Sequence, residues 1–596
     1  MTLVAVLASA CSPTAPPPDA DPATQTAPQT ENPTDDAGEL RILPEDAAYG
    51  YEDAVRERVT VFSARDDDGD GEPDAFPIDI IRPRDATEVP VILQQSPYWD
   101  NVGRGLLGEP RERSSDGTVT MFPLWYDNWF VPQGYAYAIM DSSGSGDSDG
   151  CWDNYGLSSQ ASAVAALDYF AGADWSNGSV AMVGKSADAL HALMAAATGH
   201  EALDAVVAIG GLTSYAEYTQ PGGILVEPFP LWVERSGCET FAQEWTQDFG
   251  DGTSPTELTR SLDVLQQLDG YRAASLFGHG LRDVNTRSPM VLELWDALGE
   301  RGIDRRLWLH QGGHTDPFDV RPREWVAEVD AFLDQHLRGG PGPTTEPVQL
   351  QSPDLTWRGV DALPEVTTRT LYAVGPDGLS PGSTTGSDTR AFATVESWDD
   401  WASLSEEDNL EVEQEGWFRS RVASGSSAWH HSFDTGPLEE DLVIEGVPEV
   451  TLRVRQSGEP HGITLALVAR GPGSYTDPGE SGIGHDVRRA EPVCWGGRSQ
   501  QDTGCYPGDG LARVDGDLDL IALGSHGIGR DSTAVAYQDP GDGWVEITVE
   551  LMRVDTVIPA GHELSLVVLV DDPLRGGSGQ GSSLEVGQGT LELPGS

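Results

Sequence analysis

The sequence predicts an α/β protein with a doubly wound parallel sheet and a helical cap, followed by an all-β domain. From about residue 55, apolar runs bounded by glycine alternate with helical stretches, as in VPVILQQS (89–96) and YAYAIMDS (135–142). Continuous apolar strands of this kind are typical of a parallel sheet that helices cover on both faces. From about residue 347 the pattern changes to short Val-, Leu- and Thr-rich strands between Gly, Pro and Asp turns, which is typical of a sandwich or jelly roll.

The N-terminal segment is expected to lie outside the folded body. Residues 1–11 contain a short apolar run that ends in small residues directly before Cys11. This pattern resembles an export signal with a bacterial lipobox, in which the cysteine is acylated, and it predicts an exported protein, extracellular or in the cell envelope. Residues 12–46 are rich in Pro, Thr, Ala and Asp and would form a disordered linker. An ordinary N-terminal tail with an incidental cysteine is the alternative.

The folded chain divides into segments of different pattern. Residues 47–212 and 273–342 carry the α/β pattern and are predicted to form one sheet-containing domain. Residues 213–272, which contain the helically spaced SLDVLQQLDGY, are predicted to form a helical cap over that sheet. After the Gly/Pro turn GGPGPTTEP, residues 343–596 are predicted to form the sandwich domain. Further strands expected in the sheet are SVAMVGKS (179–186), DAVVAIGG (204–211), AASLFGHG (273–280) and RRLWLHQG (305–312).

The charge balance excludes two classes of partner. The 596 residues include 97 Asp and Glu against 36 Lys and Arg, which gives a formal net charge of −61. A chain this acidic repels phosphate backbones and anionic lipid head groups, so neither nucleic acid nor a membrane surface is an expected partner. Contact with a membrane is expected only through a lipid anchor at Cys11.

Four further cysteines predict disulfides in an oxidising compartment. Cys494 and Cys505 enclose a Gly-, Gln- and Asp-rich loop and are expected to pair. Cys151 and Cys238 would form the second bridge by elimination, although sequence spacing does not fix connectivity. The sequence has no Cys-x-x-Cys pair or clustered histidine spacing that would indicate zinc.

A nucleophilic serine is predicted at Ser186. The stretch GKSADA (184–189) follows an apolar strand and opens an Ala-rich helix, which is the strand-turn-helix context of a nucleophile elbow. Such a turn holds the serine in a strained backbone conformation. Small residues are needed beside it, and Gly184 and Ala189 meet that need because bulkier side chains would collide with adjacent strands.

A serine hydroxyl needs a base and a carboxylate, which are expected downstream in the order Ser, Asp, His. Asp283 and His314 each follow a predicted strand, at the sheet edge where α/β proteins build their sites. We therefore expect His314 to be the general base and acid, and Asp283 to orient and stabilise its imidazole. His279 and His310 are the alternatives for the base, although His279 precedes the aspartate and His310 lies inside a strand.

Two donors are expected to stabilise the oxyanion that forms when the serine attacks a carbonyl. One is the backbone N–H of Ala187. The second is the hydroxyl of Tyr98, which follows an early strand in the sequence SPY (96–98) and would lie at the same edge of the sheet. The alternative for Tyr98 is an aromatic ring that only packs over the strand end.

An acidic loop near the N-terminus has the spacing of a calcium site. Asp66, Asp68, Asp70 and Asp74 alternate around a glycine, so that one loop could wrap carboxylate oxygens around Ca²⁺. The terminal bidentate Glu of an EF-hand is missing, so we expect a structural calcium loop that takes no part in catalysis. A plain acidic turn is the alternative.

Motifs that bear on the family are spread over nearly the whole folded chain. They are SPY (96–98), DSSGSGDSDGC (141–151), GKSADA (184–189), AATGHEALDAVVAIG (196–210), HGLRDVN (279–285), GHTDPFD (313–319), CW…DTGCY (494–506) and VIPAGHELSLVV (557–568). Together they resemble the Xaa-Pro dipeptidyl-peptidase and cocaine-esterase family of serine hydrolases, with the actinobacterial-type Xaa-Pro dipeptidyl-peptidases most similar.

This resemblance implies an α/β-hydrolase domain with a C-terminal jelly roll. It implies that Ser186, Asp283 and His314 form the triad and that Tyr98 donates its hydroxyl to the oxyanion. The family commonly has Tyr directly after the nucleophile and Gly three places after it, where this chain has Ala187 and Ala189. The alanine at 187 keeps the N–H donor but removes a wall of the acyl pocket, which bears on the specificity for proline.

The segment TSYAEY (213–218) is similar to the family's aromatic and acidic run near the cap entrance. Glu217 and Tyr218 are expected to contact substrate, with Glu217 holding a free amine by a charge-assisted hydrogen bond. A solvated carboxylate on the cap is the alternative for Glu217.

Three hypotheses for function follow. The leading one is an exported serine hydrolase that needs no catalytic cofactor and releases N-terminal dipeptides with penultimate proline through an acyl-enzyme. The second keeps this mechanism but replaces the peptide with a small acyl ester or amide. The third is a catalytically silent surface-binding lipoprotein in which the sandwich is the working part.

Overall fold

A computed structural model of the chain describes most of the folded body. The described residues are 41–99, 111–215, 218, 260–383, 390–396, 426–457, 461–476, 493–506, 511, 513–528, 543–570 and 583–595. The expected signal (1–11), residues 12–40 of the expected linker (12–46) and most of the expected cap (216–217 and 219–259) lie outside them. The end of the expected linker is not disordered, because Arg41 and Ile42 form a short strand that pairs with Cys494 and Trp495. Among the described residues, no helix is long and apolar enough to cross a membrane.

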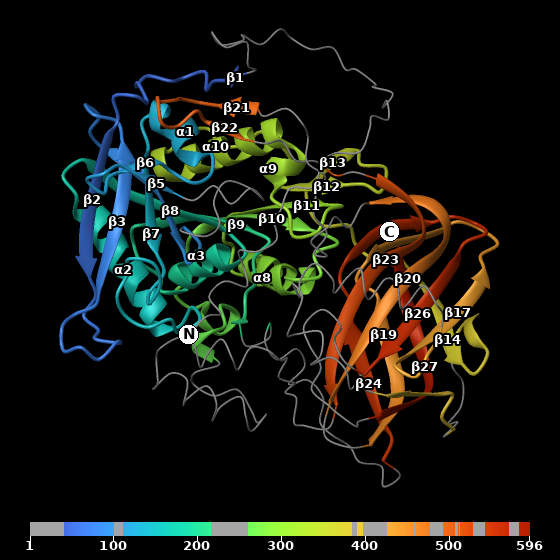
Figure 1. The fold of residues 1–596 in the computed structure, drawn as a ribbon. Coiled ribbons are helices and arrows are strands. Elements are labelled where there is room, and N and C mark those ends of the chain that lie inside the picture. The colour runs from blue at the N-terminus through green and yellow to red at the C-terminus, as the bar shows by residue number, and fades with distance from the viewer. Residues whose placement is uncertain are drawn as a thin grey trace.

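A ten-stranded sheet forms the centre of the first domain (Figure 1). Its strand order is β13-β12-β11-β10-β9-β8-β4-β7-β3-β2, and the pairs from β12 through β7 are all parallel. The strands are β2 (Val55–Phe62), β3 (Ala75–Arg82), β4 (Val89–Ser96), β7 (Ala136–Asp141), β8 (Ser176–Lys185), β9 (Leu203–Ile209), β10 (Ala274–Gly280), β11 (Arg305–His310), β12 (Val348–Gln351) and β13 (Trp357–Val360). The predicted doubly wound α/β domain is therefore confirmed.

Helices cover both faces of this sheet, which explains why its central strands are apolar throughout. On β4, Val91 and Leu93 belong to the apolar cluster on one face, whereas Ile92 belongs to the cluster on the other face. The first face packs against α2 (Leu157–Gly172), α3 (Ala187–Ala197) and α8 (Ser288–Glu300). The second packs against α1 (Tyr126–Phe130), α9 (Pro317–Val320) and α10 (Pro322–Arg338).

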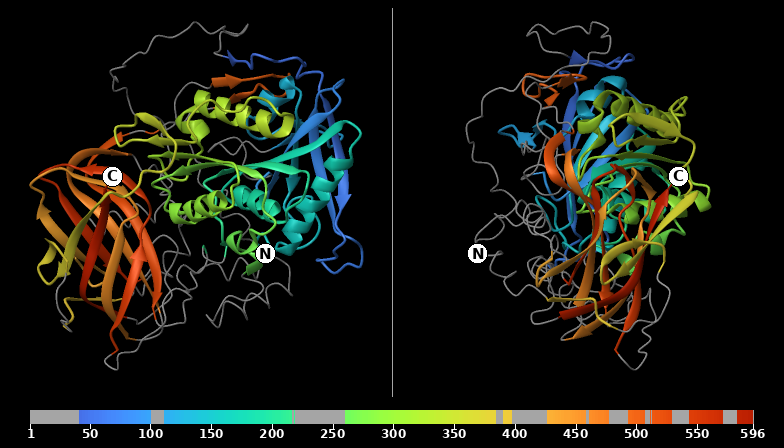
Figure 2. Two further views of the ribbon diagram at one scale, coloured as in Figure 1. Left: turned by 180° about the vertical axis from the view of Figure 1, so that it is seen from behind. Right: turned by 90° about the vertical axis from the view of Figure 1, so that its right-hand side faces the viewer.

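The C-terminal domain is all-β, and it lies beside the β10–β13 end of the large sheet (Figures 1 and 2). One sheet contains β14 (Thr368–Gly375), β15 (Gly378–Pro381), β16 (Ala393–Glu396), β19 (Glu449–Ser457), β24 (Val545–Glu550) and β27 (Ser583–Gly595). The other contains β17 (His430–Pro437), β20 (His461–Thr476), β23 (Arg513–Ile528) and β26 (Glu563–Leu569), and β18 (Leu442–Gly446) pairs separately with β25 (Val554–Ile558). Alternate residues such as Leu452 and Val454 of β19 enter the shared core, as a sandwich requires.

The border between the two domains falls later than the expected residue 343. Strand β12 pairs in parallel with β11, and β13 pairs with β12, so both extend the large sheet. All four residues of β12 are buried, because the strand continues the α/β core. The sandwich begins at β14, after residue 360.

A hairpin from within the sandwich sequence lies on the α/β domain. Strands β21 (Val493–Trp495) and β22 (Cys505–Tyr506) form a small sheet with β1 (Arg41–Ile42), above α1 and α10 in Figure 1. The Trp495 ring lies 5.8 Å from that of Trp129 and 5.4 Å from that of Phe318, measured between centroids. Residues assigned by sequence to the sandwich therefore complete the core of the other domain.

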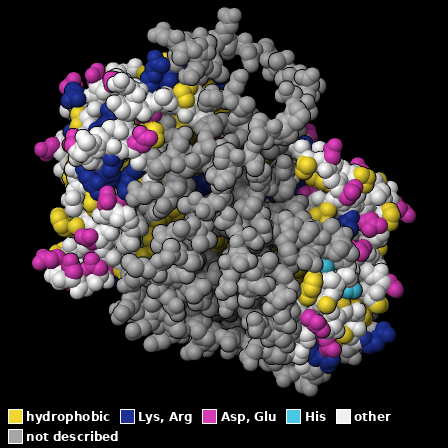
Figure 3. Space-filling model, viewed as in Figure 1, with side chains coloured by type: hydrophobic (Ala, Val, Ile, Leu, Met, Phe, Trp, Pro, Cys, Tyr) yellow, Lys and Arg dark blue, Asp and Glu magenta, His cyan; other side chains and the backbone are white. Residues whose placement is uncertain are grey.

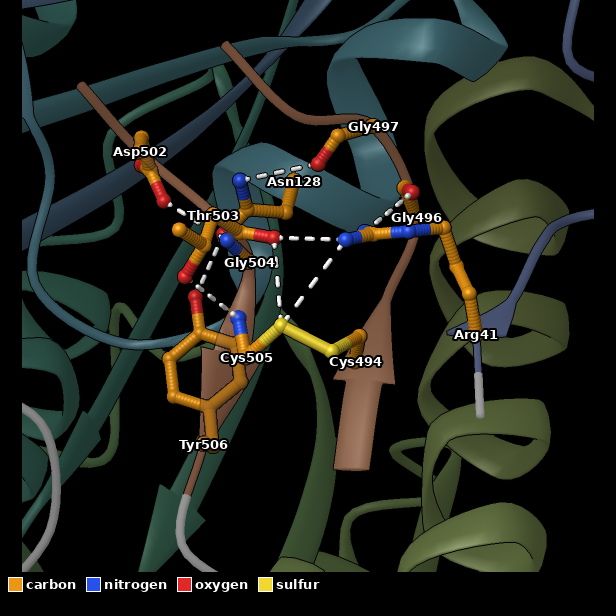
Figure 4. The surroundings of a disulfide bond; sticks show 10 residues. All are labelled: Arg41, Asn128, Cys494, Gly496, Gly497, Asp502, Thr503, Gly504, Cys505 and Tyr506. Carbon is orange, nitrogen blue, oxygen red and sulfur yellow. Dashed lines mark hydrogen bonds between the residues drawn. A yellow bond between two sulfur atoms is a disulfide. The ribbon is translucent and has the colours of Figure 1, made fainter. Parts of the chain in front are cut away.

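The expected Cys494–Cys505 disulfide closes this hairpin. Around it, Arg41 donates to the carbonyl oxygens of Gly496 and Thr503 at 3.3 and 2.8 Å (Figure 4). Cys151 is also disulfide-bonded, and its partner lies outside the described residues, as do both Cys11 and Cys238. The pairing of Cys151 with Cys238 stays a prediction.

Several short elements complete the described fold: the hairpin β5 (Glu112–Arg113) with β6 (Val119–Met121), and the 3-10 turns Val131–Gln133 and Leu265–Gln267. The stretch SLDVLQQLDGY (261–271), expected to be helical, consists mostly of turns and contains the second of these 3-10 turns. Acidic side chains are spread over both domains on the described surface visible in Figure 3. This distribution agrees with the large net negative charge of the chain.

Candidate active site

Ser186 lies at a sharp turn between β8 and α3. Its backbone has φ 60° and ψ −122°, an unfavourable conformation for a residue with a side chain. The Ser186 N–H donates to the carbonyl oxygen of Ile209 on the neighbouring strand at 2.9 Å, which holds the turn against the sheet. The side chain is half-buried rather than enclosed. These features are those of the predicted nucleophile elbow.

Small residues flank this turn for steric reasons. A Cβ added at Gly184 would collide with the backbone of Asp188 in the first turn of α3. A Cβ added at Gly211 would lie 3.0 Å from the Cβ of Ala189, which is fully buried. The helix can therefore start this close to the sheet only with small side chains at these positions.

Asp283 and His314 meet at the carboxyl edge of the sheet, beyond β10 and β11. Asp283 Oδ2 lies 2.7 Å from His314 Nδ1, and both side chains are buried. Asp283 Oδ1 accepts the backbone N–H groups of Asn285 and Thr286 at 3.0 and 2.8 Å, and its Oδ2 accepts the Thr286 hydroxyl at 2.7 Å. The carboxylate is thus fixed from several directions with one oxygen facing the imidazole.

The environment keeps Asp283 ionised. Burial alone would raise its pKa, but the charge of His314 and the hydrogen bonds from His314 and Thr286 outweigh that effect and hold the pKa well below its usual value. An ionised carboxylate can fix the tautomer of His314 and stabilise an imidazolium, which is the role required of the third group in a triad.

The end of β9 lies between the elbow and this pair. Ile209 accepts the N–H of Ser186, and the next residue, Gly210, is so close to the imidazole that an added Cβ would lie 3.2 Å from His314 Cε1. The structure therefore brings the predicted serine, histidine and aspartate to one edge of the sheet.

The two alternative histidines lie inside strands. His279 and His310 are fully buried in β10 and β11, and burial lowers the pKa of both, to about 3 for His310. His310 Nδ1 accepts the N–H of Gly312 at 3.1 Å, so that nitrogen is occupied. A buried imidazole of such low basicity is a poor acceptor for a serine proton, which favours His314.

The predicted oxyanion donors lie at the same edge. Ala187 is the first residue of α3, and no side chain caps this helix start, so its N–H belongs to a positive helix terminus. Tyr98 follows β4, which neighbours β8, and its own N–H donates to Ser96 Oγ at 3.1 Å. The Tyr98 side chain is half-buried against the core.

Three tyrosines near this edge were not all predicted from sequence. Tyr155 and Tyr215 have ring centroids 5.4 Å apart, and Tyr215 lies 6.1 Å from the expected substrate contact Tyr218. Tyr218 donates its hydroxyl to Asn285 Oδ1 at 2.7 Å, which connects the cap entrance to the loop of Asp283. Tyr155 has φ 75°, a strained conformation that its sequence gives no signal for. Glu217 lies outside the described residues.

A second carboxyl group, Asp188, lies beside the nucleophile and was not predicted as a site residue. Its Oδ2 accepts Gln94 Nε2 at 2.9 Å, and burial raises its pKa to about 7. Nearby, His191 Nε2 lies 2.7 Å from Ser142 Oγ, and burial lowers the His191 pKa to about 3. Every residue of α3 is buried, so apolar side chains would be expected at both positions.

The acidic loop is only partly assembled as predicted. Carboxylate oxygens of Asp66, Asp68 and Asp74 lie within 4.8 Å of one another, whereas Asp70 is not part of this group. Asp70 Oδ1 instead accepts the N–H of Glu72 at 2.8 Å. Asp74 is buried, and burial together with its acidic neighbours raises its pKa, an arrangement that a cation would relieve.

Comparisons with known proteins agree with this architecture. Residues 68–248 match the family model of X-Pro dipeptidyl-peptidase (S15 family), and residues 342–585 match that of the X-Pro dipeptidyl-peptidase C-terminal non-catalytic domain. A Streptomyces avermitilis protein named as an Xaa-Pro dipeptidyl-peptidase is 31% identical over 575 residues, covering 88% of this chain and 81% of its own. A similarly named Bacillus anthracis protein is 27% identical over 350 residues, 52% of this chain and 57% of its own.

Among solved structures, an α-amino acid ester hydrolase shares the fold. It superposes with a TM-score of 0.62 at 16% identity, covering 96% of this chain and all of its own. Sequence identity at this level bears on the fold alone. The superposition confirms the combination of an α/β-hydrolase domain with an all-β domain. On the sequence relationship, the chain belongs to the S15 family of Xaa-Pro dipeptidyl-peptidases, which are serine hydrolases.

Proposed function

We propose that this chain is an Xaa-Pro dipeptidyl-peptidase in which Ser186, His314 and Asp283 form the catalytic triad. The observation that carries the proposal is the buried 2.7 Å contact between His314 Nδ1 and Asp283 Oδ2, at the strand edge where Ser186 opens α3. Membership of the S15 family supports both the serine chemistry and the release of dipeptides.

The reaction follows from the placement of these groups. Ser186 Oγ attacks the carbonyl carbon of the substrate's proline while His314 Nε2 takes its proton. The oxyanion accepts hydrogen bonds from the Ala187 N–H and the Tyr98 hydroxyl, as developing negative charge requires. His314 then protonates the leaving amine, and an ester between the dipeptide and Ser186 remains. Water, deprotonated by His314, releases the dipeptide and restores the serine.

The amine of the substrate needs an acceptor at a fixed distance from the elbow, because only the second peptide bond is cut. We assign this role to Glu217, next to Tyr218 at the cap entrance. The hydrogen bond of Tyr218, the residue after Glu217, to Asn285 supports this assignment, because Tyr218 lies beside the Asp283 loop. Glu217→Gln should therefore raise KM for peptides with a free N-terminus and leave KM for N-acylated esters unchanged.

A comparison of substrates tests the proposed activity. Gly-Pro and Ala-Pro p-nitroanilides should be hydrolysed by the parent chain and not by Ser186→Ala, with dipeptide release followed by mass spectrometry. Short acyl esters are the competing substrates, since Ala187 replaces the aromatic residue that the family commonly has there. Turnover of esters without dipeptide release would replace the peptidase with an acyl ester hydrolase using the same triad.

Labelling with a fluorophosphonate probe separates both activities from a silent binding protein. The probe should modify Ser186 in the folded parent chain and fail on Ser186→Ala and after heat unfolding. If the folded parent is not labelled at any pH tested, the triad is not functional. The hydrolase proposal would then be replaced by that of a surface-binding protein without catalytic activity.

We also propose that the protein is exported and anchored by a lipid on Cys11. The oxidised pair Cys494–Cys505 supports an oxidising compartment. Expression of the full chain in a bacterial host should place the parent in the membrane fraction and Cys11→Ala in the soluble exported fraction. Equal fractionation of the two would contradict the anchor.

We propose calcium as a structural ion of the loop 66–74. Support comes from the grouping of Asp66, Asp68 and Asp74, whose carboxylate oxygens lie within 4.8 Å of one another, and from the electrostatic cost of placing three carboxylates there without a cation. The loop is remote in sequence from the triad, and the ion is assigned no part in the reaction.

A further inference from the structure

The loop that carries Asp283 contacts both domains. It connects β10 to α8 and spans residues 281–287. Asp283, Asn285 and Thr286 face the active site, where they bind His314, Tyr218 and one another. The intervening residues point the other way, toward the sandwich.

Arg282 is held by the sandwich strand β23. Its guanidinium donates to both oxygens of Asp519, at 2.5 and 2.9 Å, and to the carbonyl oxygen of Leu520 at 3.0 Å. The Arg282 side chain is 16% exposed and that of Asp519 is 6% exposed. A bidentate pair shielded from water in this way fixes the direction of the arginine as well as its position.

The rest of the loop is fastened to the same domain. Val284 is 5% exposed and belongs to the apolar core of the sandwich, not to that of the α/β domain. Arg287 Nη1 donates to Ser525 Oγ, also on β23, at 2.9 Å. At the start of α8, Ser288 Oγ accepts the N–H of Arg553 at 3.0 Å. Residues on each side of Asp283 are thus bound to a different domain from the one that holds Ser186.

We propose that the sandwich domain positions the triad carboxylate Asp283, with Asp519, acting through Arg282, as the principal positioning residue. The inference rests on the proposed role of Asp283. The side chains of the loop alternate, so a contact that fixes Arg282 and Val284 also fixes the direction in which Asp283 projects between them. A shift of about 1 Å at a catalytic group can cost about 100-fold in rate, so this contact bears on turnover as well as on stability.

The test removes the charge of Asp519 while keeping its shape. Asp519→Asn should lower kcat for Ala-Pro p-nitroanilide, and the rate constant for fluorophosphonate labelling, by about 10- to 100-fold, with KM changed less than twofold. Asp519→Glu, which keeps a carboxylate for Arg282, should recover a large part of both rates. A role in stability alone would lower the melting temperature and leave both rates intact below it.

Glu445→Gln is the matched control, because Arg358 of β13 and Glu445 of β18 form another ion pair between the two domains that does not involve the loop 281–287. This variant should lose stability but keep kcat and the labelling rate. Equal losses of rate in Asp519→Asn and Glu445→Gln would overturn the proposal. The rate would then depend on the association of the two domains in general and not on the contact between Asp519 and Arg282.

Ser525→Ala gives a second, milder probe should Asp519→Asn fail to fold. It removes the acceptor of Arg287 and should lower kcat severalfold at unchanged KM, whereas an unchanged kcat would count against the positioning role. The two failures are distinguishable: a parent chain that is neither labelled nor active refutes the proposed triad, whereas a parent that labels at the same rate as Asp519→Asn refutes only the positioning role.

Discussion

Gly210 lies against the ring of His314. A Cβ at this glycine would lie 3.2 Å from both Cε1 and Nδ1 of the imidazole and 3.6 Å from Asp283 Oδ2. The glycine has φ 49° and directly follows Ile209, whose carbonyl oxygen holds the elbow of Ser186. The end of β9 therefore contacts both the turn of the nucleophile and the ring of its base.

Replacement of this glycine should disturb the base more than the fold. Gly210→Ala adds a methyl group that pushes His314 by a few tenths of an ångström, so kcat should fall by about 10-fold, with stability lower by ~1 kcal/mol. Gly302→Ala is the control, because Gly302 also has positive φ, at 71°, but an added Cβ there meets nothing within 4 Å. Stopped-flow kinetics and thermal melts of both variants check this, and equal kcat values would contradict it.

Removal of the Tyr98 hydroxyl should slow catalysis without weakening substrate binding. Loss of one oxyanion donor costs about 100- to 1,000-fold in kcat, so Tyr98→Phe should show that loss with KM within threefold of the parent. Tyr271→Phe serves for comparison, because its hydroxyl contacts Ser275 Oγ at 2.8 Å near the start of β10, away from the carboxyl edge. That variant should change stability only. A Tyr98→Phe enzyme with parental kcat would mean that the ring merely packs.

Asp188 should make stability fall as pH rises toward neutrality. Burial raises its pKa from 3.8 to about 7, so between these values the folded chain holds a proton that the unfolded chain has released. The free energy of unfolding therefore decreases through this range, at up to ~1.4 kcal/mol per pH unit. The side chain of Asp188→Asn cannot ionise, so the free energy of unfolding of this variant should not show this decrease. The difference in unfolding free energy between variant and parent should therefore be larger at pH 8 than at pH 5, by about 2 kcal/mol or more.

Chemical unfolding at the two pH values measures this difference. Asp269→Asn is the control because the Asp269 side chain is fully exposed, so its effect should be equal at both pH values. If Asp188→Asn shows no greater advantage at pH 8 than at pH 5, the carboxyl is already ionised in the folded chain at pH 5.

The Cys494–Cys505 disulfide should stabilise the hairpin on the α/β domain. A closed loop with a separation of 11 residues restricts the unfolded chain, and its removal by a double Cys→Ser replacement should cost about 2–3 kcal/mol. Limited proteolysis should then cut within residues 496–504 sooner than in the parent. A reducing agent should lower the melting temperature of the parent more than that of the variant; an equal effect on both would assign the loss to another disulfide, such as that of Cys151.

Chelation of calcium should lower the stability of the folded chain and leave its catalytic rate unchanged. With EDTA, the melting temperature of the parent should fall by several degrees, while the kcat measured well below it stays within twofold. Asp68→Asn should melt at the chelated temperature with or without calcium. An unchanged melt together with no bound metal by elemental analysis would identify the loop as a plain acidic turn.

Much of the site could be predicted because it follows from strand order. Asp283 and His314 each come directly after an apolar run, and parallel strands deliver their following residues to a common edge. The strand-turn-helix pattern likewise predicted Ser186, since only small neighbours fit the turn. These are local signals, and each is contained within about ten residues of sequence.

The remaining features depend on contacts between distant segments. Nothing around Asp519 indicates that its carboxylate binds Arg282, 237 residues earlier in the chain. The assignment of β12 and β13 to the sandwich was wrong because the turn before them resembles a domain linker, although both strands extend the large sheet. The sequence gives no signal for Asp188, because a carboxyl group in a buried helix turn is unexpected and is stabilised by hydrogen bonds to Gln94 and Ser96 from a distant strand.

The pairing of Arg41 with Cys494 affects how this protein reaches its native state. Strand β1 pairs with a strand that is synthesised about 450 residues later, so the small sheet on the α/β domain can form only after most of the chain has been made. The α/β domain therefore cannot be excised intact, because removal of the C-terminal half would take away Trp495, whose ring packs against Trp129 and Phe318.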